Sequence, residues 1–79
     1  MQENERLELS GTVESVTFHN ESNGFTVLEL NTGSDLVTAV GVMGDVRAGE
    51  QLRLIGAWET HSSYGPQFHA EACEQVLPT

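Results

Sequence analysis

The sequence predicts an all-β fold, a small closed barrel of five strands joined by short turns. Five runs of residues have the apolar pattern of strands, and segments rich in glycine and asparagine separate them. The length agrees with this fold, because 79 residues with 38% hydrophobic content suffice for one small core. We expect a single domain over residues 7–79, preceded by a flexible polar arm over residues 1–6.

The first predicted strand covers residues 7–18. Apolar residues occupy odd positions from Leu7 to Val13, and polar residues lie between them, as in a half-buried strand. The apolar residues then move to even positions, the last of which is Phe18. A β-bulge near residues 14–15 would reconcile the two halves, so we expect one long, bent strand of the kind that closes small barrels.

Four more strands are predicted, over residues 25–30, 36–42, 52–58 and 68–76, with turns over residues 19–24, 31–34 and 62–66. The connection over residues 44–51 has room for one helical turn at most. This feature favours an oligonucleotide/oligosaccharide-binding (OB) type of barrel. An SH3-like barrel is the alternative, since strand count hardly separates the two. The predicted core includes the aromatic residues Phe18, Phe25, Trp58 and Phe68.

The charge balance restricts the function. Twelve acidic residues face three arginines and no lysine, which gives a formal net charge of −9. A phosphate chain would be repelled, because nucleic-acid affinity depends largely on lysine and arginine. Without lysine the chain holds neither a Schiff-base nucleophile nor a phosphate-binding loop of the GxxxxGK[ST] type. We therefore predict a non-catalytic chain with no catalytic residues and no cofactor of its own.

Candidate nucleic-acid contacts are few. Three ring side chains in or beside the predicted turns could stack on bases, and two arginines inside the domain supply positive charge. These weak candidates are His19, Arg47, Arg53, His61 and Tyr64. DNA binding by the isolated domain is the less favoured interpretation, because the electrostatic attraction is missing.

Metal binding is also disfavoured. His61, His69 and Cys73 are ligand types, but they lack the paired spacing of zinc sites, and we predict no metal site. On a strand, His69 and Cys73 would share one face, opposite Phe68 and Ala70. The lone cysteine predicts a reducing, cytoplasmic location, and no apolar run is long enough for a membrane span.

Several segments together resemble a known family. NGFTV (residues 23–27) and YGPQF (residues 64–68), with LSGTVE (residues 9–14), are similar to the N-terminal OB-like domain of the long bacterial RecD-like DNA helicases. The similarity spans about residues 9–74. It implies a superfamily 1 parent, like the exodeoxyribonuclease V alpha subunit, that moves 5′ to 3′ on single-stranded DNA in repair and recombination. ATP and magnesium would bind to motor domains located after Thr79.

The leading hypothesis is therefore a non-catalytic accessory domain of such a helicase. Its partners would be the motor domains of the same polypeptide or another protein, and single-stranded DNA would be bound by the parent; no membrane is involved. The second hypothesis is an independent single-stranded nucleic-acid-binding OB module. The third is a metal-dependent or regulatory domain that uses His61, His69 and Cys73.

Overall fold

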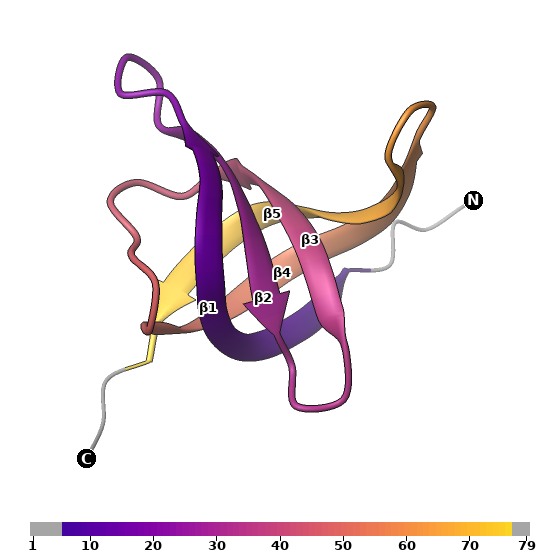
Figure 1. The fold of residues 1–79 in the computed structure, drawn as a ribbon, viewed down its shortest axis with the longest axis horizontal. Helices are drawn as coiled ribbons and strands as arrows, with labels where there is room; N and C mark the ends of the chain where they lie inside the picture. The colour runs from indigo at the N-terminus through magenta and orange to yellow at the C-terminus, as the bar shows by residue number, and fades with distance from the viewer. Residues whose placement is uncertain (1–5, 77–79) are drawn as a thin grey trace.

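The computed structural model of the protein describes residues 6–76. The predicted arm falls outside these residues except for Arg6, as do residues 77–79 of the predicted domain. Five strands form a closed barrel in the order β1-β2-β3-β5-β4 (Figure 1). They are β1 (Leu7–His19), β2 (Phe25–Asn31), β3 (Leu36–Val42), β4 (Gln51–His61) and β5 (Gly65–Gln75).

The pairing pattern confirms the predicted fold class. Strands β3 and β5 run parallel, whereas the other neighbouring strands are antiparallel. Strand β1 closes the barrel because it pairs with both β2 and β4. This closed, five-stranded order fits an OB-like fold. Within residues 6–76 no helix is long and apolar enough to cross a lipid bilayer.

Strand β1 is long and strongly bent, as predicted (Figure 1). Its first half, Leu7 to Thr12, pairs with β4, and its second half, Thr12 to His19, pairs with β2. The register shifts between Val13 and Ser15, which confirms the predicted bulge. A second shift follows between Val16 and Phe18, and the sequence pattern did not reveal it.

The core fills the inside of the barrel and draws on all five strands. The connection between β3 and β4 contributes too, because two of its side chains, Met43 and Val46, are buried with the strand residues. This segment contains a turn where the sequence left room for a helical one. The buried cluster consists of Val13, Leu28, Leu30, Val37, Ala39, Met43, Val46, Leu52, Leu54, Phe68 and Ala70.

Two residues predicted to lie in the core are instead half exposed. Phe18 is 50% exposed and Trp58 is 49% exposed, whereas Phe68 is 0% exposed as predicted. The second register shift in β1 turns Phe18 outward. Trp58 keeps the inward side of β4, but it follows Gly56, the last β4 residue that pairs with β1 among the described residues. Beyond Gly56 the β4–β5 hairpin projects from the barrel (Figure 1). The Trp58 ring therefore covers Phe68 edge-on, with the ring centroids 5.4 Å apart.

Candidate binding groove

A groove lies over the outer face of β2 and β3, between the β1–β2 and β4–β5 hairpins. In Figure 1 these hairpins project at the upper left and upper right of the barrel. The cavity has a volume of about 610 Å³. Its floor consists of side chains that point outward from the two strands, and they are Phe25, Val27, Glu29, Thr38 and Val40.

The alternation of buried and outward-facing side chains along β2 determines which of its residues form the floor. Thr26, Leu28 and Leu30 are buried, which leaves Phe25, Val27 and Glu29 on the outer face. Phe25 was expected in the core, but it is only partly buried and lines the groove. Because the run from Phe25 to Leu30 has apolar residues at both parities, the sequence alone did not identify which side of the strand faces outward.

The end of β1 forms one wall of the groove, which Thr17 and Phe18 line, and the β1–β2 turn follows it. Asn20 and Asn23 cap this turn, since their Oδ1 atoms accept hydrogen bonds from the backbone N–H groups of Ser22 (2.8 Å) and Phe25 (2.9 Å). Gly24 has a φ of 80°, which a residue with a Cβ rarely adopts. Phe18 stands beside this turn, with its ring centroid 6.5 Å from that of Phe25.

His19 is held by the same turn. Its Nδ1 lies 3.0 Å from the Thr26 hydroxyl, which itself donates to the Gly24 carbonyl oxygen over 3.0 Å. Because the hydroxyl proton is used in that bond, the histidine Nδ1 is the donor to Thr26 Oγ1. Thr26 is fully buried, so this chain of bonds fixes the end of β1 against β2. His19 thus has a structural contact next to the groove.

The β4–β5 hairpin forms the opposite wall and brings two candidate residues together. The rings of His61 and Tyr64 pack against each other, with centroids 4.6 Å apart. His61 Nδ1 accepts hydrogen bonds from the backbone N–H groups of Ser63 (3.0 Å) and Tyr64 (3.3 Å). Both rings line the groove, and Tyr64 is 78% exposed. Of the five predicted nucleic-acid contacts, these two residues line the groove.

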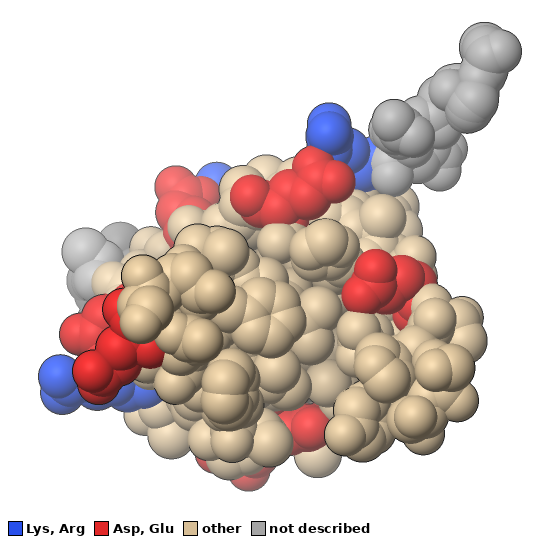
Figure 2. All heavy atoms as spheres, turned by 90° about the horizontal axis from the view of Figure 1, so that it is seen from above, with Lys and Arg blue, Asp and Glu red and all other residues tan. Residues whose placement is uncertain are grey.

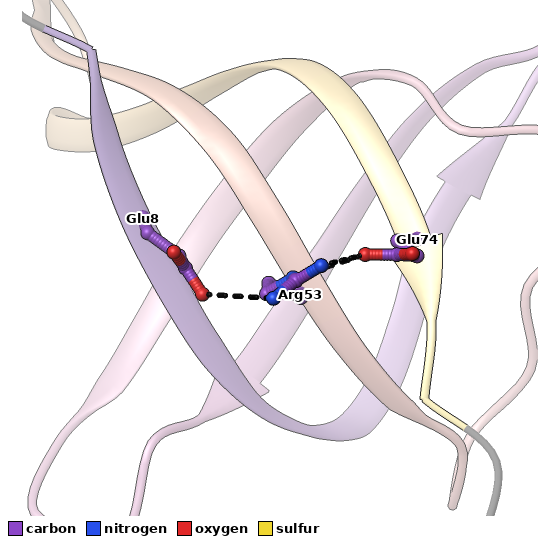
Figure 3. Close-up of polar contacts among 3 residues, drawn as sticks. All are labelled: Glu8, Arg53 and Glu74. Carbon is purple, nitrogen blue, oxygen red and sulfur yellow. Dashed lines mark hydrogen bonds and ion pairs between the residues drawn. The ribbon is translucent and has the colours of Figure 1, made fainter.

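The two arginines predicted as contacts lie elsewhere. Arg53 projects from the outer face of β4 and is held between Glu8 of β1 and Glu74 of β5 (Figure 3). Its Nη1 lies 3.5 Å from Glu8, and its Nε donates to Glu74 over 3.0 Å. The hydrogen bonds and charge of Glu74, followed by the charge of Glu8, raise the pKa of Arg53. Arg47 lies in the β3–β4 connection, 4.0 Å from Asp45.

The third arginine is paired as well, because Arg6 Nε donates to Glu71 over 2.7 Å. Arg6 and Arg53 are thus hydrogen-bonded to carboxylates, Arg47 has an exposed carboxylate 4.0 Å away, and the chain has no lysine. Figure 2 shows the molecule from above: tan side chains occupy the middle of this face, red carboxylates surround them, and blue atoms lie at its margins. Positive charge is thus not gathered at the groove.

The proposed metal ligands do not converge in the described part of the chain. Ile55 pairs with Ala72 but Gly56 pairs with Ala70, so Glu71 is an extra residue and β5 has a bulge there. The expectation that His69 and Cys73 share a face is wrong, because the bulge turns Cys73 toward the core while His69 stays exposed. Within residues 6–76, no three His, Cys, Asp or Glu side chains are grouped as metal ligands.

The closed strand order and the groove between two hairpins define the class as a small OB-like barrel, in which strands two and three and these loops commonly bind oligonucleotides or oligosaccharides. The family model described as the OB-fold domain of the ATP-dependent DNA helicase YrrC matches residues 6–78. The chain belongs to this family of helicase OB-fold domains. The resemblance found in the sequence is confirmed to that extent.

Proposed function

We propose that the chain is a non-catalytic accessory domain at the N-terminus of an ATP-dependent 5′ to 3′ DNA helicase of the RecD-like type. It would serve docking or positioning, while motor domains of the same polypeptide bind ATP, magnesium and single-stranded DNA. The matching family model supports this proposal, because its description names a DNA helicase. The parent would act in cytoplasmic DNA repair or recombination.

One observation carries the accessory role: Arg6 and Arg53 are hydrogen-bonded to carboxylates, and Arg47 lies 4.0 Å from Asp45. Affinity for a phosphate chain comes mainly from basic side chains that displace its counterions. An arginine already paired with an acidic residue must exchange that partner for phosphate, so its net contribution is small. With a net charge of −9 in addition, the domain is suited to contact protein surfaces rather than DNA.

The second candidate function is a single-stranded nucleic-acid-binding module. One observation favours it: His61 and Tyr64 form an exposed ring pair at the groove where OB-like barrels commonly bind oligonucleotides. Stacking of a base on an aromatic ring contributes about 1–3 kcal/mol. Stacking alone would give weak binding here, since the described residues that line the groove beside the rings include no arginine.

The experiment compares the full-length parent with a version that lacks this domain. The reading frame should first continue past Thr79 into a GxxxxGK[ST] motif. We expect both versions to hydrolyse ATP in response to single-stranded DNA with similar DNA affinity, and the truncated version to unwind duplex DNA less efficiently. Loss of single-strand affinity on truncation would contradict the accessory role and favour the second candidate.

A further inference from the structure

The groove floor changes in chemistry along its length. The residues pair across β2 and β3 as Phe25 with Val42, Val27 with Val40, and Glu29 with Thr38. One end is therefore aromatic and aliphatic, and the other end carries a carboxylate beside a hydroxyl. Outward side chains on one strand repeat every second residue, about 7 Å apart. The floor thus presents two apolar positions followed by one acidic position at the spacing of an extended chain.

Glu29 is the acidic side chain that lines this groove. Its Oε2 accepts a hydrogen bond from the Thr38 hydroxyl over 3.0 Å, a neutral partner that leaves its negative charge uncompensated. All three arginines are engaged with other carboxylates, namely Glu71, Asp45 and the pair Glu8 and Glu74. Among residues 6–76, Glu29 has no arginine partner.

The hairpin walls add aromatic faces to this floor. Phe18 and Tyr64 stand on opposite sides and keep much of their surface exposed. Aromatic faces attract cations as well as apolar groups, because the electron density of the ring is negative over its face. A cationic side chain entering the groove would meet attraction from the rings and from Glu29, whereas a phosphate would meet the repulsion of Glu29 without a compensating arginine.

We propose that this groove binds an extended protein segment that places two apolar side chains and one lysine or arginine on the same face. The apolar side chains lie over Phe25 and Val27, and the cation pairs with Glu29. The inference rests on the proposed function, since it names the chemistry of the partner that the accessory domain contacts. Charge complementarity selects such a segment over a second copy of this acidic chain or a nucleic acid.

The test uses capped synthetic pentapeptides and NMR titration of the isotope-labelled protein. The first peptide, Leu-Ser-Leu-Ser-Arg, presents two leucines and an arginine on one face when extended; the second has glutamate in place of the arginine. We expect the arginine peptide to shift the amide resonances of Val27, Glu29 and Val40, and the glutamate peptide to leave them unchanged. The inference would be overturned if both peptides cause equal shifts or if neither causes a shift. It would also be overturned if the shifts are confined to another surface.

Two variants with the same change in net charge sharpen the result. Glu29→Gln keeps an oxygen that accepts the Thr38 bond but removes the groove charge, and it should weaken binding of the arginine peptide about two- to fivefold, as expected for one partly exposed ion pair. Asp35→Asn removes a charge in the β2–β3 turn and should leave the affinity unchanged. Equal weakening by both variants would show that only net charge matters and would contradict a site at Glu29.

A third titration separates this inference from the function on which it rests. A short thymidine oligonucleotide should leave the groove resonances unchanged. If the oligonucleotide shifts them at low salt, the accessory role itself fails, and the groove is a nucleic-acid site. If both the oligonucleotide and the arginine peptide are silent, the accessory role stands and the inference about the groove is wrong.

Discussion

Charged side chains have different partners on the two sides of the barrel. On the outer surface of β1, β4 and β5, Arg53 lies between Glu8 and Glu74, and the three side chains satisfy one another (Figure 3). On the outer surface of β2 and β3, Glu29 has a hydroxyl for a partner and apolar neighbours. On the β1, β4 and β5 side, Arg53 is therefore neutralised by carboxylates of the same chain. On the β2 and β3 side, the charge of Glu29 has no cationic partner among the described residues, and aromatic rings line the groove beside it. In this domain, Arg53 is part of an ion-pair network within the chain.

The largest expected effect is the difference in stability between removing the buried ring of Phe68 and removing the half-exposed ring of Phe18. Phe68→Ala should lower the free energy of unfolding by about 3–5 kcal/mol, because the ring is fully buried and packs against Trp58. Phe18→Ala should cost about 1 kcal/mol or less, since half of that side chain is already exposed. Urea denaturation of both variants measures the difference. Equal losses would show that Phe18 belongs to the core after all.

The next prediction tests how closely β4 and β5 approach each other at Gly56. Gly56→Ala should lower the free energy of unfolding by about 2–4 kcal/mol, because a Cβ at this position would collide with the His69 carbonyl oxygen on β5. Ser62→Ala, in the exposed β4–β5 turn, is the control and should change stability by about 0.5 kcal/mol at most. Thermal unfolding by circular dichroism compares the two. A stable Gly56→Ala variant would mean that β4 and β5 separate easily.

Cys73, on the inner face of β5, should react slowly in the folded protein. Burial, followed by the charge of Glu50, raises the pKa of its thiol. The folded state thus favours the neutral thiol, and this contribution to stability is lost as pH rises through the raised pKa. Iodoacetamide labelling followed by mass spectrometry should show the rate for the folded chain rising at higher pH than the rate in urea. Identical pH profiles would contradict the inward position of Cys73.

The smallest expected effect on stability comes from removing the surface ion pairs of the arginines. Arg53→Gln should lower the urea midpoint slightly, because Glu8 and Glu74 lose the cation between them. Arg47→Gln should have less effect still, since its pair with Asp45 is longer and more exposed. Added salt should reduce the difference between Arg53→Gln and the unchanged protein, because ions screen exposed pairs. A difference that grows with salt would rule out an electrostatic cause.

The strands, their order along the chain and the first bulge could be predicted because alternation and turn residues are local signals. The second shift in β1 and the bulge at Glu71 could not, since each depends on how a neighbouring strand pairs. These irregularities decided whether Phe18 and Cys73 face outward or inward. The partners of Arg53 were also hidden, because Glu8 and Glu74 reach it across strands that are distant in sequence.

The most direct test of the charge pattern is a fluorescence anisotropy titration of labelled single-stranded DNA with this domain over a series of salt concentrations. Because the net charge is −9 and both Arg6 and Arg53 are already paired with carboxylates, we expect no saturable binding even at low salt. Saturable binding that weakens steeply as salt is added would show that the arginines leave their carboxylates for phosphate, and it would contradict the accessory role.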